Sequence, residues 1–335
     1  MIAGVGAAKR SIYWEIHSLL ADDPEYDFIG LLKQKALSGV RVVLVLDALG
    51  SAGLRSRARN LLLEAGVEVR TFRKVFYGIH KKVLLIDEEI AYLGGVNVGR
   101  RFRHWLDLNL MIRGPVVQNL LRSFSRSYKL ADGKNENILK FYEERMTWRA
   151  KRKLKAVRYW IIDHAPILKK QHRLRKYYER KIGLAKKSLI FVTPYFLPHR
   201  WMVQSLKNAM ARGVRVEVIM PKAADIFMMR IANDVYWHQL KKSGINFYLS
   251  PKMVHAKALL VDGREGLVGS NNIDALSFNF NTETGIVFKE PAMLSNLKNI
   301  LESWKQDAIL LDQKAAPRWH KRPVAWLIWL IHPFI

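Results

Sequence analysis

The sequence predicts an α/β protein with two copies of one structural unit, each a mixed β-sheet flanked by helices. Two observations predict this class. Residues 80–87 read His-Lys-Lys-Val-Leu-Leu-Ile-Asp and residues 255–262 read His-Ala-Lys-Ala-Leu-Leu-Val-Asp, so His, Lys and Asp recur at the same spacing. The segments before these two motifs also correspond in order and in length. We therefore expect two repeats, related by a pseudo-twofold axis, that share one active site.

Three pairs of segments precede the motifs and alternate between helix and strand. They are residues 8–14 and 185–191, 39–47 and 213–221, and 65–69 and 243–247. In the second pair a glycine ends a helix and a run of β-branched residues begins a strand. Gly39 lies 41 residues before His80 and Gly213 lies 42 before His255, so the copies keep nearly the same length up to the motif.

The apolar runs inside the motifs, residues 83–86 and 258–261, do not alternate with polar residues. This pattern is typical of strands that are covered on both faces. The motif histidine and lysine, two residues apart at the start of the strand, then point to the same face. Asp87 and Asp262 fall at the far ends of the strands, so we expect them to form turns or caps rather than to take part in chemistry.

A small-residue turn, an asparagine and a carboxylate follow each motif. Asn97 and Asn272 each lie 17 residues after the motif histidine, and Asp107 and Glu283 follow 27 and 28 residues after it. Each copy thus carries histidine, lysine, asparagine and carboxylate in one order. Asp107 also fits the simpler role of ending a strand. The eight other histidines, His17 among them, lack this set, and we assign them no catalytic role.

The repeated set suits the transfer of a phosphodiester between alcohols. If the two motif faces meet, one neutral imidazole attacks phosphorus, and the other, protonated, gives its proton to the departing alkoxide and later activates the incoming hydroxyl. A carboxylate on the other nitrogen of each ring fixes its tautomer and raises its basicity. The chemistry requires no metal ion or other cofactor. The residues assigned to it are His80, His255, Lys82, Lys257, Asp107 and Glu283.

The composition predicts a polyanionic partner. The 335 residues contain 56 Lys and Arg against 29 Asp and Glu, which gives a net charge of +27. Such a surface attracts nucleic acid or a bilayer of anionic lipid, and charge alone does not choose between them. Cysteine is absent, which excludes disulfides and thiolate metal sites. The sequence has no run of 18 apolar residues of the kind that spans a bilayer.

Changes in composition divide the chain. We assign residues 1–133 to the first repeat and 183–311 to the second, and we expect the first to lack an N-terminal strand, because the second has an extra segment before its first helix. Residues 134–182 are predicted to form a basic, aromatic helical linker, either solvated or lying at a membrane surface. Residues 312–335 are basic and then apolar, and are predicted either to pack on the body of the protein or to lie in a membrane surface; we favour an anchor at the membrane surface.

The doubled motif, with the turns Gly-Gly-Val-Asn at 94–97 and Gly-Ser-Asn-Asn at 269–272, resembles the signature of the phospholipase D superfamily. Residues 194–198, Pro-Tyr-Phe-Leu-Pro, and 277–283, Ser-Phe-Asn-Phe-Asn-Thr-Glu, are similar to those of bacterial-type cardiolipin synthases. The resemblance implies that a phosphatidyl group passes from phosphatidylglycerol to a histidine and that glycerol leaves. A second phosphatidylglycerol then takes the group to form cardiolipin.

The same resemblance implies a role for each residue. His80 is the nucleophile and His255 the acid and base, although the symmetry of the repeats leaves this order open. The side chains implied to hold phosphate oxygens are Lys82, Lys257, Asn97, Asn272 and Ser270.

Other activities stay open. Water in place of the lipid alcohol gives a hydrolase that makes phosphatidic acid, and the positive charge also suits a nuclease acting on DNA or RNA. A third alternative is a membrane-binding module without activity. The apolar C-terminal tail favours a lipid substrate, and we expect a peripheral membrane protein at the cytoplasmic face of the bacterial inner membrane. The sequence does not predict an oligomeric state.

Overall fold

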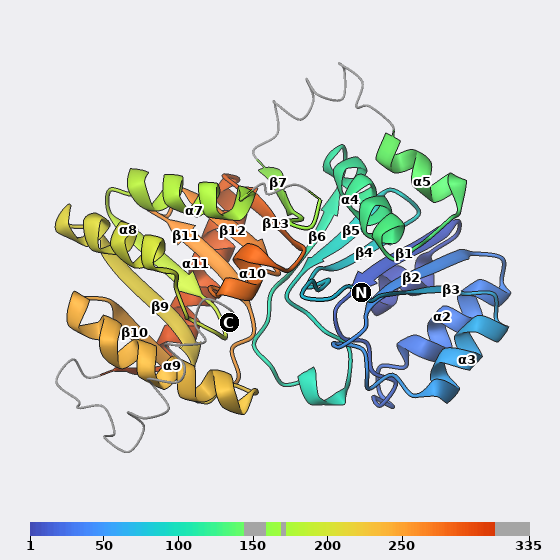
Figure 1. Ribbon diagram of the computed structural model, residues 1–335, viewed down its shortest axis with the longest axis horizontal. Helices are drawn as coiled ribbons and strands as arrows, with labels where there is room; N and C mark the ends of the chain where they lie inside the picture. The colour runs from blue at the N-terminus through green and yellow to red at the C-terminus, as the bar shows by residue number, and fades with distance from the viewer. Residues whose placement is uncertain (144–158, 169–171, 312–335) are drawn as a thin grey trace.

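The computed structural model describes residues 1–143, 159–168 and 172–311 of the chain. It contains two β-sheets side by side, one from each repeat (Figure 1). The first sheet has six strands in the order β3-β2-β1-β4-β5-β6. These strands are β1 (Ser11–Ile16), β2 (Arg41–Asp47), β3 (Glu68–Phe72), β4 (Lys82–Ile86), β5 (Ile90–Gly94) and β6 (Asn109–Arg113).

The second sheet repeats this order and adds a strand at each edge, giving β14-β10-β9-β8-β11-β12-β13-β7. Its strands are β7 (Tyr159–His164), β8 (Ser188–Val192), β9 (Arg215–Pro221), β10 (Asn246–Ser250), β11 (Lys257–Val261), β12 (Glu265–Gly269), β13 (Glu283–Phe288) and β14 (Ile309–Leu310). In each sheet three strands run parallel and the motif strand joins them antiparallel. The structure therefore confirms two mixed-sheet repeats.

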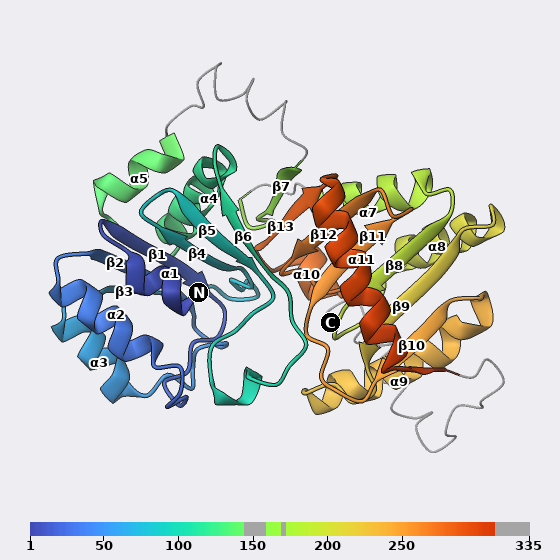
Figure 2. The ribbon, with the colours of Figure 1, turned by 180° about the vertical axis from the view of Figure 1, so that it is seen from behind.

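Helices cover both faces of each sheet (Figures 1 and 2). Helices α1 (Ile2–Ala7), α2 (Phe28–Leu37) and α3 (Ser56–Glu64) lie on one face of the first sheet, and α4 (Val116–Leu130) and α5 (Glu136–Glu143) on the other. Helices α7 (Arg173–Leu184), α8 (Arg200–Ala211) and α9 (Phe227–Leu240) pack on one face of the second sheet, and α11 (Pro291–Gln306) on the other. The short helices are η1 (Arg100–Phe102), η2 (Lys241–Ser243) and α10 (Ala275–Asn279).

One hydrophobic core runs across both repeats. Tyr13 and Phe124 of the first repeat belong to the same buried cluster as Leu260, Ile286 and Leu301 of the second. Burying this much apolar surface at the junction holds the repeats together, because apolar area removed from water is the main favourable contribution to packing. The junction between the repeats is therefore a packed interior.

The motif strands are the central strands of their sheets. All five residues of β4 and all five of β11 are buried, which confirms that they are covered on both faces. Their pairing also repeats, because Ile86 lies opposite Ile12 and Val261 lies opposite Leu189, each six residues after its motif histidine. The two copies therefore share one register.

The segment predicted to be a helical linker is different in the structure. Residues 159–164 form β7, which pairs antiparallel with β13, and residues 173–182 belong to α7 of the second repeat. The run Tyr-Trp-Ile-Ile has high strand propensity and covers what would otherwise be a bare sheet edge. Residues 144–158, the most basic part of the linker, and the predicted anchor at 312–335 lie outside the described residues. No helix within the described ranges is both long and apolar enough to cross a bilayer.

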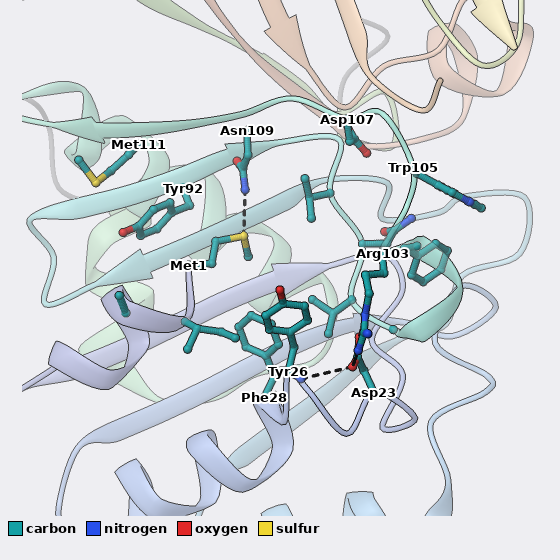
Figure 3. Close-up of a pocket in the computed structure, with 17 residues that line it drawn as sticks. Met1, Asp23, Tyr26, Phe28, Tyr92, Arg103, Trp105, Asp107, Asn109 and Met111 are labelled. Atoms are coloured by element: carbon teal, nitrogen blue, oxygen red, sulfur yellow. Dashed lines mark hydrogen bonds and ion pairs between the residues drawn. The ribbon is translucent and has the colours of Figure 1, made fainter. Parts of the chain in front are cut away.

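The first repeat has an open cavity where the second repeat is filled. In the second repeat Tyr178 of α7 hydrogen-bonds Asn271 and packs edge-on against Phe278. Met1 lies seven residues before Ala8, as Tyr178 lies seven before the matching Ala185, and beside Met1 is a cavity of about 680 Å³. Figure 3 shows this cavity with Met111 towards one end and Asp107 at the other. The repeats thus differ most at this outer corner.

A buried ion-pair network joins the repeats and predicts a large effect on stability. Lys81 is fully buried, with its Nζ 3.1 Å from the carboxylate of Asp163 in β7 and 3.9 Å from Glu15. The guanidinium of Arg126 also lies 2.8 Å from the carboxylate of Asp163. Asp163→Ala leaves buried cations with too little negative charge, so we expect the free energy of unfolding to fall by about 3 kcal/mol or more in urea denaturation.

The exposed pair Arg175–Glu179 provides the matched control. Glu179→Ala is expected to change stability by less than about 1 kcal/mol, because solvent screens an exposed pair. Equal effects of the two substitutions would contradict the role given to Lys81 and Asp163.

Candidate active site

The two motif histidines line one cavity at the junction of the repeats. The cavity has a volume of about 730 Å³, and its walls include His80, His255, Asn97 and Asn272. The histidines come just before β4 and β11, the central strands of the two sheets. The fold therefore brings both copies of the motif to one place.

Backbone hydrogen bonds hold each motif against the other repeat. The N–H of His80 donates to the carbonyl of Thr282 at 3.1 Å, and the N–H of His255 donates to the carbonyl of Leu106 at 2.8 Å. In both cases the accepting residue directly precedes the carboxylate of its own repeat. Each histidine is thus placed beside the carboxylate that comes from the opposite half of the molecule.

The carboxylates pair with the histidines across the junction. Nδ1 of His80 lies 3.0 Å from Oε1 of Glu283, and Nδ1 of His255 lies 2.7 Å from Oδ2 of Asp107. A carboxylate only accepts hydrogen bonds, so Nδ1 of each ring carries a proton and Nε2 is the basic atom when the ring is neutral. The sequence predicts that these carboxylates hold the rings, and the structure adds that each one serves the histidine of the other repeat.

The two motif lysines lie beside their histidines. Nζ of Lys82 donates to the carbonyl of His80 at 2.6 Å, and Nζ of Lys257 donates to the carbonyl of His255 at 2.5 Å. Nζ of Lys257 also lies 2.8 Å from Nε2 of His255. Both ammonium groups are buried behind the histidines that line the cavity, and their positive charge raises the affinity of the site for an anion.

Burial and the two lysines keep the histidines neutral. Burial, followed by the charges of Lys82 and Lys257, holds the pKa of His80 well below its usual range. Burial and then Lys257 lower the pKa of His255 to about 4, although Asp107 opposes them. A neutral imidazole is the form that can attack phosphorus or accept a proton.

The pKa values of the lysines and carboxylates beside the histidines are also shifted. Burial lowers the pKa of Lys257 to about 8 and, with the charge of Lys257, lowers that of Lys82. Burial raises the pKa of Glu283. Burial acts the same way on Asp107, but His255, Lys257 and the N–H of Leu108 together outweigh burial and lower the pKa of this carboxyl. Strong shifts of this kind gather at sites that do chemistry.

The asparagines and the serine predicted to bind phosphate have different surroundings. The side-chain oxygens of Asn97 and Asn272 are buried and have no hydrogen-bond partner among the described residues. Ser270 instead donates its hydroxyl to Glu283, and Ser277 donates to the same carboxylate at 2.7 Å. The hydroxyl of Ser270 therefore holds a carboxylate in this structure, while the two asparagines face the cavity.

One aromatic ring packs against each motif histidine. The ring of His17 lies edge-on to His80 with centroids 4.8 Å apart, and Trp105 lies 4.9 Å from His255. Nδ1 of His17 is 3.0 Å from the carbonyl of Ile79, to which it donates. The sequence gives His17 no role, because only the pairing of β1 with β4, where Ile16 lies opposite Lys82, brings the two rings together.

Asp87 and Asp262 lie away from the cavity and bind backbone. Asp87 accepts hydrogen bonds from the N–H groups of Lys9, Arg10 and Ser11, where β1 begins, and Asp262 accepts the same three bonds where β8 begins. Both have a φ of +53°, a conformation that Asp tolerates better than most residues. The two aspartates thus fasten the start of one central strand to the end of its neighbour.

Asp87→Ala is therefore expected to reduce stability more than activity. Three N–H groups lose a charged acceptor, so we expect the free energy of unfolding to fall by about 2 kcal/mol in urea denaturation. Turnover per folded molecule should stay within about twofold, because Asp87 does not line the cavity. Asp262→Ala is the matched variant and should have the same effect; a loss of turnover without a loss of stability would contradict this role.

The chain matches a family model described as cardiolipin synthase, PLD-like domain, over residues 1–128 and 178–305. It is 28% identical to the probable cardiolipin synthase YwiE of Bacillus subtilis, over 95% of the chain and 65% of that protein. It is 28% identical to a cardiolipin synthase of Clostridium perfringens, over 89% of the chain and 66% of that protein. The chain thus spans about two thirds of the length of these relatives.

Two further comparisons complete this picture. The minor cardiolipin synthase ClsB of Bacillus subtilis is 26% identical, over 98% of the chain and 84% of that protein. Among solved structures, the phosphatidylserine synthase of Haemophilus influenzae has a similar fold, with a TM-score of 0.76 at 14% identity over 100% of this chain and 92% of that one. At this identity the likeness concerns the fold alone.

Proposed function

We propose that the chain, which belongs to the family of cardiolipin synthase phospholipase D-like domains, is a phosphatidyltransferase that makes cardiolipin from two molecules of phosphatidylglycerol. The observation that carries the proposal is the single cavity in which each motif histidine is paired with the carboxylate of the other repeat. The names of the relatives support the choice of a lipid substrate. Such a substrate places the reaction at an anionic phospholipid membrane, and the cytoplasmic face of the bacterial inner membrane stays a prediction.

The first step forms a bond between nitrogen and phosphorus. Nε2 of neutral His80 attacks the phosphorus of phosphatidylglycerol, and the bond from phosphorus to the glycerol oxygen breaks. His255, protonated on Nε2, gives its proton to the departing alkoxide, so that glycerol leaves neutral. Glu283 holds Nδ1–H of His80 and stabilises the positive charge that the ring gains.

In the second step the phosphatidyl group moves from His80 to a second lipid alcohol. His255, now neutral, removes the proton from a hydroxyl of a second phosphatidylglycerol, and that oxygen attacks phosphorus. The bond between His80 and phosphorus breaks, cardiolipin is released, and both rings return to their first state. If water took the place of the lipid alcohol, the product would be phosphatidic acid.

The surroundings of the two rings support His80 as the nucleophile. Lys257 lies 2.8 Å from Nε2 of His255, whereas Lys82 donates to the backbone carbonyl of His80, so the lone pair on Nε2 of His80 is the less hindered of the two. When a phosphodiester binds, Lys257 contacts a phosphate oxygen instead and leaves Nε2 of His255 to carry the proton. A bound phosphodiester adds a negative charge to the cavity, which raises the pKa of His255 from its low value and favours the protonated form needed for the first step. Lys82, Lys257, Asn97 and Asn272 are the side chains that we assign to the phosphate oxygens.

The pKa values predict the pH dependence of kcat/KM, which reports the free enzyme. The pKa of His80 lies well below 6.5, so the neutral nucleophile persists and kcat/KM should not fall as the pH drops through 6.5. It should rise instead, because the pKa of the acid His255 is about 4 in the free enzyme and a larger fraction of it carries the proton at lower pH. The pKa of Lys257 is about 8, so above that pH its positive charge is lost and kcat/KM should fall.

The measurement is kcat/KM from pH 5 to about 10 with dispersed short-chain phosphatidylglycerol. Lys257→Arg is the matched variant, because arginine keeps its charge, and it should move the alkaline fall to higher pH. An acidic fall with its midpoint at 6.5 or above would contradict the low pKa of His80.

The proposed function is tested by incubating the protein with phosphatidylglycerol vesicles and measuring the products by mass spectrometry. We expect cardiolipin and glycerol in equal amounts. Phosphatidic acid without cardiolipin would identify a hydrolase. Cleavage of single-stranded DNA with no lipid product would identify a nuclease, and either result would replace the proposed activity.

A further inference from the structure

Large apolar side chains are exposed around the mouth of the catalytic cavity. Their exposed fractions run from 44% for Met228 to 89% for Leu49. The set, here called the apolar rim, consists of Leu49, Val75, Phe76, Ile226, Phe227 and Met228. Single exposed apolar residues are common on soluble proteins, but a cluster around one opening marks a surface that contacts another apolar phase.

The fold explains why these residues gather at one place. They lie on the segments that follow β2, β3 and β9, and the carboxyl ends of parallel strands meet at one edge of a sheet. Leu49, Phe76 and Ile226 also line the cavity itself. The rim therefore draws on both repeats. In Figures 1 and 2, α9, which begins with Phe227, lies at the lower edge of the molecule.

Positive side chains stand among the apolar ones. Arg73, Lys74 and Arg101 line the same cavity, and no ion pair to a carboxylate is found for them within the described part of the chain. The cavity carboxylates nearest the rim are already engaged, since Asp47 accepts from backbone N–H groups and Asp225 accepts from the hydroxyl of Tyr195. The opening thus combines apolar side chains with available positive charge.

We propose that the apolar rim inserts into the surface of an anionic phospholipid bilayer and seats the mouth of the cavity on the headgroups. The apolar side chains enter the boundary between headgroups and acyl chains, while the three cations contact lipid phosphates. The inference rests on the proposed function, because an anionic phospholipid is the substrate of that function. It names the part of the molecule that meets the membrane.

Charge favours a bilayer over a second copy of the chain as the occupant of this surface. A symmetric dimer through the rim would bring Arg73, Lys74 and Arg101 of both copies together, and like charges at close range repel. An anionic bilayer neutralises the same three groups. Docking also solves a problem of access, because His80 and His255 are buried and can reach a lipid phosphate only if the headgroup enters the cavity.

The test compares the triple variant Val75→Ser, Phe227→Ser and Met228→Ser with the intact chain. None of these three residues lines the cavity. The control is the triple variant Leu37→Ser, Leu63→Ser and Leu184→Ser, whose residues are 66%, 47% and 60% exposed. They lie at the C-terminal ends of α2, α3 and α7, each of which precedes a strand, so they are at the edge of the sheets opposite the rim. Binding is measured by flotation with vesicles of phosphatidylglycerol, and turnover with both vesicles and dispersed short-chain phosphatidylglycerol.

We expect the rim variant to bind vesicles at least about tenfold more weakly and to lose turnover on vesicles by a similar factor, while dispersed substrate is turned over as before. The control should behave like the intact chain. Equal vesicle binding by the rim variant and the intact chain would overturn the inference. So would a rim-dependent dimer in solution whose vesicle binding does not need the rim.

The two proposals can fail separately. Rim-dependent binding to vesicles without any turnover of phosphatidylglycerol would support the docking surface and reject the proposed activity. Cardiolipin synthesis that does not depend on the rim would do the reverse.

Discussion

Replacing either motif histidine by alanine is expected to lower kcat/KM for the transfer between phosphatidylglycerol molecules by about 10⁴-fold or more. His80→Ala removes the atom that bonds to phosphorus, and His255→Ala removes the group that protonates the leaving glycerol. Cardiolipin formation measured by mass spectrometry checks this result. His104→Ala is the matched control, because His104 is exposed and does not line the cavity. Retention of a tenth of the activity by either motif variant would contradict the paired mechanism.

A substrate with a better leaving group separates the two roles. A phosphatidyl ester of nitrophenol needs no proton on its leaving oxygen, so His255→Ala should release nitrophenolate in a burst of about one equivalent while His80→Ala releases none. The His255→Ala protein should then hold the phosphatidyl group on His80, because no base activates the second alcohol. A burst from His80→Ala and none from His255→Ala would make His255 the nucleophile and His80 the acid and base. The mechanism with two paired histidines would still hold.

The second large effect is expected from the carboxylates. Asp107→Asn and Glu283→Gln replace the carboxylate that accepts from Nδ1–H of the other repeat's histidine by a neutral amide. The NH2 of the amide can donate to Nδ1 and so favour the wrong tautomer, and the amide no longer stabilises a positive ring. We expect kcat/KM to fall by about 10²- to 10⁴-fold. The measurement is the same transfer assay, run across pH, because a positioning residue changes the protonation of its histidine as well as the rate.

Asp225→Asn is the control for these variants, since Asp225 lines the same cavity and hydrogen-bonds Tyr195 rather than a motif histidine. It should keep activity within about tenfold, since it touches no reacting group. A normal pH profile and rate in Asp107→Asn and Glu283→Gln would show that the pairing across the repeats does not serve the reaction.

The two repeats of the fold could be predicted from the sequence because local patterns of residues determine them. Unbroken apolar runs predict β4 and β11 as central strands, and the structure has them at 82–86 and 257–261. The backbone contacts of Asp87 likewise agree with a structural rather than a chemical placement. These features depend on neighbours in sequence or on a register that both copies repeat.

Features that depend on contacts between elements far apart in the chain could not be predicted from the sequence. The exchange of Asp107 and Glu283 between the repeats arises from the backbone bonds that hold each motif on the other half. His17 reaches His80 only through strand pairing, and the hydroxyl of Ser270 turns to Glu283 because that buried carboxylate needs donors. The strand at 159–164 was assigned to a linker because its basic flanks outweighed the short aromatic and β-branched run.

The stereochemical course at phosphorus is the most direct test of the central claim, in which two histidines act in turn on one phosphate. The substrate is phosphatidylglycerol in which sulfur replaces one non-bridging oxygen, so that phosphorus is chiral, and an oxygen isotope labels the other. The configuration of the cardiolipin product is determined by phosphorus NMR. Two displacements, one by His80 and one by the lipid alcohol, predict retention of configuration. Inversion would mean a single direct displacement and would contradict the account.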